Sequence, residues 1–190
     1  DEYRLWSEFE PYYLNLDKEN FYKRLEKIFK KDTIKKIADI YLRDLGDNQE
    51  GNKYKHALSN LMTDWTFGMH ALDLLERHQN KSYGYFFNEP SPLLGGKLGA
   101  YHASELPYVF GSANKKIFKD FCSEYSDEIS NFFQFSWSQF AKTGSPSSHL
   151  MDWEVYENNS FITYINSAPK IKTFKNKDRI KLLNESKPNF

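Results

Sequence analysis

Histidine is the side chain best suited to proton transfer near neutral pH, because it titrates there. The chain has five histidines: His56, His70, His78, His102 and His149. Four of them lie on expected helices or in a polar loop, where surface or packing roles are the simpler interpretation. His102 follows a Pro- and Gly-rich loop at residues 89–99 and precedes a short apolar segment. Catalytic residues are often held on such loops, so His102 is the candidate for proton transfer.

Metal binding is the other common use of histidine. The sequence contains no His-x-x-x-His or Cys-x-x-Cys spacing, and such pairs are typical of zinc sites. The segment Gly95-Gly96-Lys97 has the spacing of neither a phosphate-binding loop nor a dinucleotide-binding motif. We therefore expect no metal and no other cofactor.

A histidine that acts as a general base needs a nucleophile to activate. In α/β-hydrolases the nucleophilic serine stands in a Gly-x-Ser-x-Gly turn, and the chain contains no such pentapeptide. Ser112 and Ser145 stand in ordinary turn sequences, and Cys122 is expected to be a small structural residue on a helix. None of these residues is predicted to be a nucleophile.

Composition limits the class of protein and its partners. The 190 residues, 39% of them hydrophobic, suffice for one domain with a core. Basic and acidic residues balance at 26 each, so no nucleic-acid partner is expected. No apolar run approaches the roughly 20 residues of a membrane span. The single cysteine, Cys122, forms no disulfide within the chain, which fits either a cytoplasmic or an exported protein.

Hydrophobic periodicity predicts helices separated by few strands. Helices are expected over residues 20–43 (two helices with a break at Asp32-Thr33), 54–78, 126–143 and 178–185. Ser126 is the expected N-cap of the third of these, and Gly144 its end. Strands are expected at residues 82–88 and 161–165. This order indicates part of an α/β sheet, and two strands do not make a stable sheet alone, so the chain is expected to be part of a larger fold.

The segment around His102 resembles a known family. Residues 96–111 (Gly-Lys-Leu-Gly-Ala-Tyr-His-Ala-Ser-Glu-Leu-Pro-Tyr-Val-Phe-Gly) are similar to the catalytic-histidine segment of type B carboxylesterases. This family includes bacterial para-nitrobenzyl esterases and animal cholinesterases. Three further segments match in the same order: Asp1-Glu2-Tyr3-Arg4-Leu5-Trp6, Thr63-Asp64-Trp65-Thr66-Phe67 and Trp137-Ser138-Gln139-Phe140-Ala141-Lys142-Thr143-Gly144-Ser145-Pro146.

The resemblance implies a fold of the α/β class. Residues 1–190 would be the C-terminal portion of a single α/β-hydrolase domain, mostly helices with the last strands of the central sheet. The N-terminal portion, with the nucleophile, would be a missing partner of the same fold. Asp64, in the matching segment at residues 63–67, is expected to be structural and to form a buried helix-to-loop hydrogen bond.

The resemblance also implies a serine esterase that acts on a small-molecule ester. His102 would be the general base and Glu2 the acid of a Ser-Glu-His triad; read without the family, Glu2 is a solvated carboxylate near a chain end. Leu5 and Trp6 follow Glu2 where the family often places pocket-lining residues, and core packing is the alternative. Glu105 is either a second buried carboxylate that supports the hydrogen-bond network of the site or a turn-capping residue.

Two alternatives to an active esterase remain open. Some relatives of cholinesterases have lost catalysis and act as adhesion modules, although retention of Glu2 and His102 argues against this role here. A non-functional remnant would expose the apolar face that normally packs on the missing sheet. Without the serine nucleophile, the chain alone is expected to hydrolyse no ester efficiently.

Overall fold

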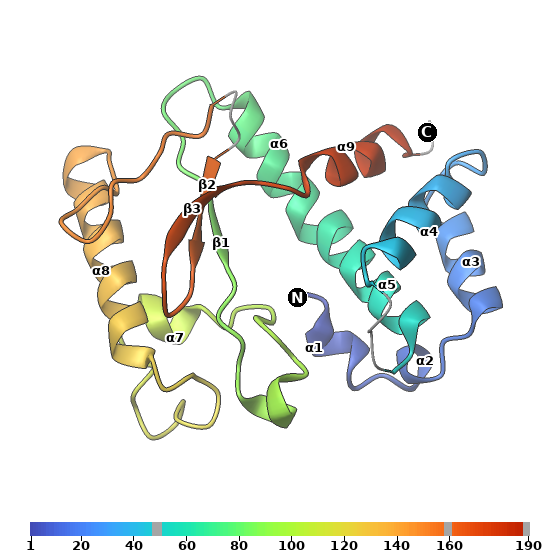
Figure 1. Cartoon of the computed structure of the whole chain (residues 1–190), viewed down its shortest axis with the longest axis horizontal. Helices are drawn as coiled ribbons and strands as arrows, with labels where there is room; N and C mark the ends of the chain where they lie inside the picture. Colours follow the sequence, from blue (N-terminus) through green and yellow to red (C-terminus); the bar gives the residue numbers. More distant parts are fainter. Residues whose placement is uncertain (47–50, 158–160, 188–190) are drawn as a thin grey trace. The chain divides into compact units, whose positions relative to one another are not determined.

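The computed structural model describes residues 1–46, 51–157 and 161–187. The chain forms two compact units (Figure 1). The first unit consists of Asp1–Asp73 and Lys175–Phe190, and the second of Leu74–Phe174. The first unit thus combines segments from both ends of the sequence, and the second unit is the stretch of chain between them.

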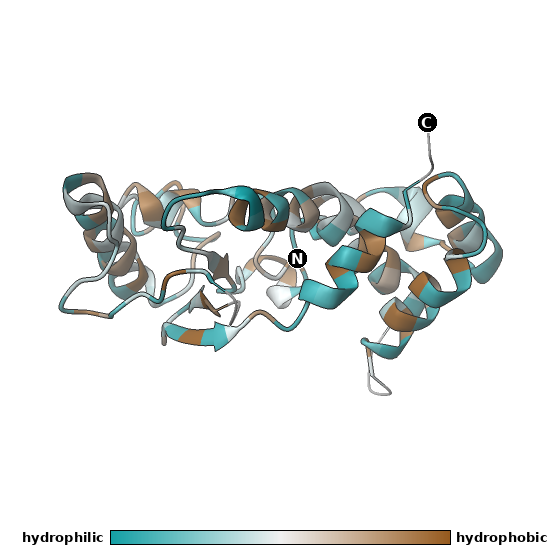
Figure 2. Cartoon of the chain, turned by 90° about the horizontal axis from the view of Figure 1, so that it is seen from above, coloured by the Kyte–Doolittle hydropathy of each residue, from teal (hydrophilic) through white to brown (hydrophobic). Residues whose placement is uncertain are grey.

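The first unit is helical. Its elements are α1 (Arg4–Ser7), α2 (Pro11–Leu14), α3 (Lys18–Glu26), α4 (Ile34–Arg43), α5 (Lys53–Thr63), the π-helix η1 (Asp64–Gly68), the start of α6 (Met69–Arg77) and α9 (Lys177–Glu185). The predicted pair of helices over residues 20–43 and the final helix are confirmed. The predicted helix over residues 54–78 is present, but a π-helical turn interrupts it. Hydrophilic and hydrophobic stretches alternate along these helices (Figure 2).

Side chains define where these helices begin. The Asp17 carboxylate accepts a hydrogen bond from the Asn20 backbone N–H at 2.8 Å and caps α3. The Asn52 side chain caps α5 by accepting from the N–H groups of Tyr54 and Lys55. At the predicted break before α4, the Thr33 hydroxyl donates to the Lys30 carbonyl at 2.8 Å instead of capping the helix. The break is therefore confirmed, without a side-chain cap.

The core of the first unit lies between α3, α4 and α5. Phe21 and Leu25 lie one helical turn apart on α3 and are fully buried, as are Ile37 on α4 and Leu58 on α5. Leu183 brings α9 into the same cluster. This i, i+4 spacing is the pattern expected for helices that bury one face.

A buried carboxylate joins three elements of the first unit. Asp64, at the start of η1, accepts a hydrogen bond from the Tyr41 hydroxyl of α4 at 2.8 Å. Arg179 of α9 forms an ion pair with the same Asp64 oxygen at 2.6 Å and a second one with Asp44 at 3.1 Å. Burial raises the pKa of the Asp64 carboxyl, and Arg179 and Tyr41 act in the opposite direction. Asp64 is therefore structural, as expected, but its partners lie on helices and not in a loop.

The second unit contains a three-stranded sheet. The strands are β1 (Tyr85–Phe87), β2 (Phe161–Ile165) and β3 (Lys170–Thr173), in the order β1-β2-β3. β1 pairs with β2 in parallel and β2 pairs with β3 in antiparallel. The two predicted strands are confirmed, and β3 was not predicted. Its sequence, Lys-Ile-Lys-Thr, is mostly exposed at the edge of the sheet, where lysines are common and the hydrophobic signal is weak.

The second unit also contains the end of α6 from Leu74, the 3-10 helix η2 (Leu93–Gly96), α7 (Leu106–Val109) and α8 (Ser126–Thr143). The N-cap of α8 is Tyr125, so the prediction of Ser126 as the N-cap is wrong. The Ser126 hydroxyl instead donates to the Ser123 carbonyl. Gly144 ends α8 with a positive φ of 75°, as predicted. Cys122 is buried in a bend before α8 and not on a helix, contrary to the prediction.

Aromatic packing holds α8 to the sheet and to α7. Phe133 of α8 is fully buried, and its ring centroid lies 5.8 Å from Phe87 of β1. Phe87 also contacts the Tyr108 ring of α7 at 5.5 Å. Ile165 of β2 is buried in the same cluster. The high aromatic content of the chain therefore contributes to a core in which ring pairs set the spacing of the elements.

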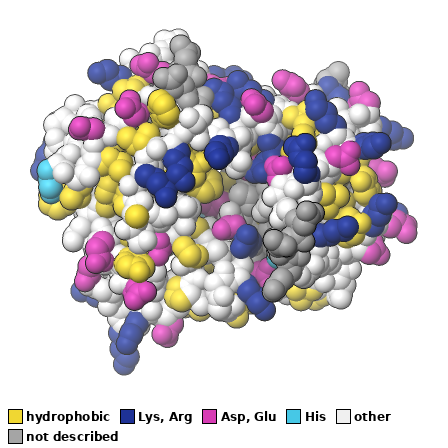
Figure 3. Space-filling view, viewed as in Figure 1, with side chains coloured by type: hydrophobic (Ala, Val, Ile, Leu, Met, Phe, Trp, Pro, Cys, Tyr) yellow, Lys and Arg dark blue, Asp and Glu magenta, His cyan; other side chains and the backbone are white. Residues whose placement is uncertain are grey.

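The second unit also exposes large apolar side chains near α7. Phe110 is 75% exposed and Ile117 is 73% exposed. The face in Figure 3 shows apolar side chains between interspersed basic and acidic ones. No helix in the described part of the chain is long and apolar enough to cross a membrane.

The buried ion pair predicts a stability effect. Replacing Asp64 by Asn leaves the buried Arg179 guanidinium without its closest carboxylate. We expect this change to lower the free energy of unfolding by about 3 kcal/mol, the usual cost of breaking a buried pair. Urea titration followed by circular dichroism measures it. Asp39→Asn, at an exposed position of α4, is the matched control, and equal small effects of both changes would contradict the structural role.

Candidate active site

The segment before His102 is held by two hydrogen bonds of Ser91. The Ser91 backbone N–H donates to the Gly99 carbonyl at 3.0 Å, which closes the loop that contains η2. The Ser91 hydroxyl donates to the Phe121 carbonyl at 2.7 Å and ties this loop to the segment before α8. Ser91 is buried. The Pro- and Gly-rich loop predicted before His102 is therefore anchored at a fixed place in the second unit.

His102 lies in the turn between this loop and α7. The Ser104 N–H donates to the Tyr101 carbonyl at 3.0 Å, and the Leu106 N–H donates to the Ala103 carbonyl at 3.2 Å. Ala103 has a φ of +66°, a left-handed conformation that costs a residue with a Cβ roughly 1–2 kcal/mol. Such strain is typical of functional sites. The strained residue is the immediate neighbour of the candidate base.

His102 borders a mainly apolar cavity of about 490 Å³ in the second unit. Its walls include Leu106, Pro107, Phe110, Ile117 and Phe121. The His102 side chain is exposed and therefore accessible to a ligand. A largely apolar cavity with a few polar groups is the usual form of a small-molecule site.

Ser104 and Cys122 are two of the polar residues that line the cavity. Ser104 is 7% exposed, and its hydroxyl has no hydrogen-bond partner among the residues that the structure describes. Burial raises the pKa of the Cys122 thiol, although the neighbouring Tyr108 hydroxyl acts in the opposite direction. Burial raises the pKa of Tyr108 to about 12. Neither Cys122 nor Tyr108 is therefore poised to ionise near neutral pH.

Glu105 precedes α7 and is half-buried. Its backbone carbonyl accepts hydrogen bonds from the N–H groups of Tyr108 and Val109, both at 3.0 Å. Its side chain makes no capping hydrogen bond to α7. Glu105 thus contributes to the start of α7 through its backbone and not through its side chain. It stands three residues after His102 in the sequence.

Glu2 stands two residues before α1, and three interactions attach the segment around α1 to α5. The Tyr3 N–H donates to the Thr63 hydroxyl at 3.0 Å, and the Ser7 hydroxyl donates to the Ser59 hydroxyl at 3.1 Å. Lys55 and Glu8 form an almost fully buried ion pair at 2.8 Å. Glu2 itself is half-buried. The segment that carries the proposed acid is therefore fixed to the core of the first unit.

Leu5 and Trp6 are half-buried on α1. The Trp6 ring stacks on the Phe67 ring of η1, with centroids 6.4 Å apart and planes 20° apart. It also contacts the Tyr3 ring at 5.3 Å. Trp6 thus has aromatic packing partners on two elements and still keeps part of its surface exposed.

The structure places the candidate residues in two groups. Glu2, Leu5 and Trp6 belong to the first unit, and His102 and Glu105 to the second. Sequence analysis missed the cavity beside His102. A signal was available in Ile117, Phe118 and Phe121, whose spacing resembles one face of a helical turn. The described residues contain no cluster of three or more His, Cys, Asp or Glu able to hold a metal ion.

Comparison with known proteins decides the family of this chain. Residues 7–183 match the carboxylesterase family. The chain belongs to this family. It is 30% identical over 146 residues to the para-nitrobenzyl esterase of Bacillus subtilis (strain 168), a match that covers 74% of this chain and 27% of that protein. The resemblance to type B carboxylesterases that the sequence predicted is therefore confirmed.

Solved structures confirm the predicted fold class. A carboxylesterase of Geobacillus stearothermophilus superposes with a TM-score of 0.78 at 20% identity, over 96% of this chain and 38% of that one. A solved PNB esterase gives a TM-score of 0.68 at 25% identity, over 96% of this chain and 36% of that one. The fold is that of part of an α/β-hydrolase, and the chain spans less than two fifths of the length of these relatives.

The strain at Ala103 predicts an unusual effect of glycine. Glycine adopts a positive φ without the Cβ penalty, so Ala103→Gly should raise the free energy of unfolding by about 1 kcal/mol. Ala141→Gly, at an exposed position in the last turn of α8, should instead lower it, because glycine is unfavourable in helices. Chemical denaturation of both variants checks the opposite signs. If Ala103→Gly also lowered the free energy of unfolding, the left-handed conformation of Ala103 would be contradicted.

Proposed function

We propose that this chain is the C-terminal portion of a single carboxylesterase domain and supplies His102 and Glu2 to a Ser-Glu-His triad. The observation that carries the proposal is the position of His102, on an anchored turn beside an apolar cavity, in a chain of the carboxylesterase family. A neutral ester with apolar groups suits such a cavity because burial of apolar surface favours binding.

The reaction would proceed through an acyl-enzyme. A serine hydroxyl from the preceding portion of the domain attacks the ester carbonyl, and His102 takes the hydroxyl proton. His102 then gives this proton to the leaving alkoxide as the C–O bond breaks. A water molecule repeats the sequence on the acyl-serine, and the carboxylic acid leaves. Glu2 would accept a hydrogen bond from the other imidazole nitrogen, which fixes the tautomer and stabilises the imidazolium.

The remaining site residues would act around this pair. Trp6 keeps exposed ring surface while Phe67 and Tyr3 hold it in place, so it is suited to contact an apolar group of the substrate. Leu5 would extend the same wall. Glu105, half-buried beside the His102 turn, would support the hydrogen-bond network of the triad without touching the substrate.

Features of the second unit support the preceding portion of the domain as a partner. β1 is the terminal strand in the sheet order, and it pairs in parallel with β2. Its other edge therefore has no strand partner within the described residues. Parallel strands are normally buried inside larger α/β sheets, and exposed Phe110 and Ile117 provide further apolar surface. We propose that β1 pairs with a strand of the preceding portion.

The triad assignment predicts that esterase activity depends on His102 and Glu2. The chain alone should not hydrolyse para-nitrophenyl acetate efficiently. Mixed with, or joined to, the N-terminal segment encoded upstream, it should hydrolyse this ester. His102→Ala should then lower kcat at least about a thousandfold, and Glu2→Gln should lower it several hundredfold, because triad residues act as a unit. Absorbance of the released para-nitrophenolate measures the rate.

A matched histidine variant separates catalysis from folding. His149 is exposed, and its ring packs on Phe135 away from the cavity that His102 lines, so His149→Ala should keep full activity. Circular dichroism and gel filtration establish that each mixture is folded and associated. A folded, associated mixture that hydrolyses no ester would overturn the esterase proposal and favour a binding or adhesion role.

The role proposed for Trp6 has a separate test in the reconstituted esterase. Trp6→Ala should raise KM about tenfold and change kcat less, because the loss of an apolar wall removes about 1–2 kcal/mol of binding. Trp6→Phe should restore most of the affinity. Unchanged KM in Trp6→Ala, with lower stability, would assign Trp6 to core packing alone.

A further inference from the structure

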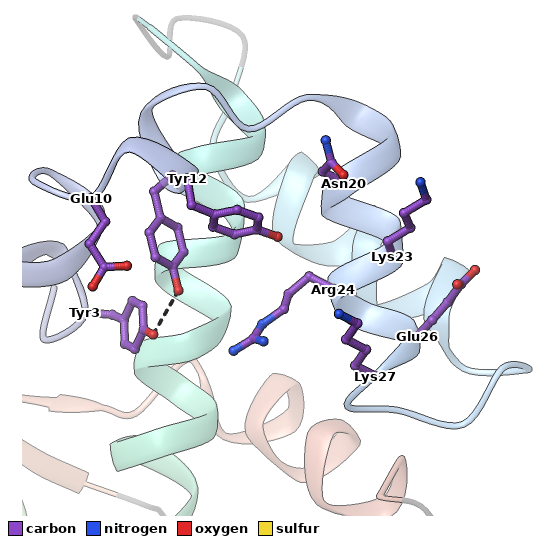
Figure 4. Close-up of a pocket in the computed structure, with 9 residues that line it drawn as sticks. Tyr3, Glu10, Tyr12, Asn20, Lys23, Arg24, Glu26 and Lys27 are labelled. Atoms are coloured by element: carbon purple, nitrogen blue, oxygen red, sulfur yellow. Dashed lines mark hydrogen bonds between the residues drawn. The ribbon is translucent and has the colours of Figure 1, made fainter.

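The first unit contains a second cavity with a different chemistry. It encloses about 600 Å³ between the α1–α2 segment and α3. Figure 4 shows tyrosine rings on one side of it and the side chains of α3 on the other. The residues that carry the argument are Glu10, Tyr12, Tyr13, Arg24, Glu26 and Lys27. All of them lie within the first unit. Tyr3 also lines the cavity and holds Trp6 in the proposed esterase site, whereas the six residues just named have no role there.

Arg24 provides an unsatisfied donor at this cavity. Its Nε atom is buried and has no hydrogen-bond partner among the described residues. A buried charged donor without an acceptor is costly. In Figure 4 the Arg24 guanidinium extends from α3 toward the tyrosine side of the cavity. Guanidinium groups bind carboxylates through two parallel hydrogen bonds, so an oxyanion would supply the missing acceptor.

The tyrosine pair supplies a further donor. The hydroxyls of Tyr3 and Tyr13 lie 2.9 Å apart and share one hydrogen bond. One of the two donates in this bond, so the hydrogen of the other remains available. Burial raises the pKa of Tyr13, which keeps its hydroxyl protonated at neutral pH. The cavity thus offers hydroxyl as well as guanidinium donors to one ligand.

The charges around the cavity favour a singly charged ligand. Lys23 is already paired with Glu19 at 2.6 Å, so the cations available to a ligand are Arg24 and Lys27. The carboxylates of Glu10 and Glu26 also line the cavity and repel a dianion more strongly than a monoanion. The exposed Tyr12 ring and the neighbouring Tyr13 ring can cover the apolar part of a ligand.

We propose that this cavity is a binding site for small aromatic monocarboxylates, with Arg24 as the residue that binds the carboxylate. The ligand's carboxylate would accept from the guanidinium and from the free hydroxyl hydrogen of the tyrosine pair. Its ring would pack against Tyr12. The site does not depend on the esterase reaction, because it needs neither His102 nor the preceding portion of the domain.

The test is titration of the chain with benzoate by isothermal calorimetry at neutral pH and low salt. Benzoate should bind with one saturable site, and benzyl alcohol, which lacks the carboxylate, should bind at least tenfold more weakly. Arg24→Gln should weaken benzoate binding at least tenfold. Lys18→Gln removes an exposed cation of α3 that does not line the cavity and should leave the affinity unchanged.

A second variant keeps the proposal testable if Arg24→Gln fails to fold. Tyr13→Phe retains the ring and removes the hydroxyl, and it should weaken benzoate binding about threefold to tenfold, consistent with loss of a hydrogen bond. Inorganic phosphate should bind more weakly than benzoate. Equal binding of phosphate and benzoate, or benzoate binding that neither variant alters, would overturn the site.

Discussion

The buried carboxylate of Asp64 is the interaction on which the first unit depends. A carboxylate removed from water is stable only with charged or hydrogen-bonding partners, and Asp64 takes them from α4 and α9. The pair therefore joins the last described helix to helices formed from the first third of the chain. The second unit, Leu74–Phe174, lies between these two partners in the sequence. The π-helical turn that begins at Asp64 lies where this carboxylate meets both partners, and such turns are common at sites with a specific task.

Local sequence patterns predicted most of the helices because each of these helices buries one face. Phe21, Leu25 and Ile37 carry this periodicity, and Gly144 ends α8 as its position suggested. The features that were missed depend on contacts distant in sequence. β3 exists because Lys170–Thr173 pairs with β2, although its side chains carry no burial pattern. Ser126 was assigned as an N-cap, but its hydroxyl bonds to the Ser123 carbonyl and the helix begins one position earlier.

The residues of the candidate esterase site also divide into those that the local sequence suggested and those that it did not. The loop position of His102 suggested a functional role from the local sequence, whereas Glu2, Leu5 and Trp6 entered through the resemblance to carboxylesterases. No periodicity in the sequence relates residues so far apart in the chain. The strain at Ala103 has no sequence signature either, since alanine and serine occur in every kind of turn. The same holds for the buried Ser104 hydroxyl, which has no hydrogen-bond partner among the described residues. These features emerge only when the backbone path around His102 is known.

The cavity beside His102 and the cavity beside Arg24 suit ligands of different charge. The walls around His102 are mainly apolar, so they favour a neutral ester over an ion, whose transfer from water is expensive. In the proposed reaction, hydrolysis would convert the neutral ester into a carboxylate, which such walls would retain poorly, and this difference would favour release of the acid product. The site proposed beside Arg24 would have the reverse preference, because the guanidinium Nε–H, which has no acceptor among the described residues, would attract an ionised ligand. A carboxylate bound there would therefore not compete with an ester beside His102, and the two cavities can act independently within one chain.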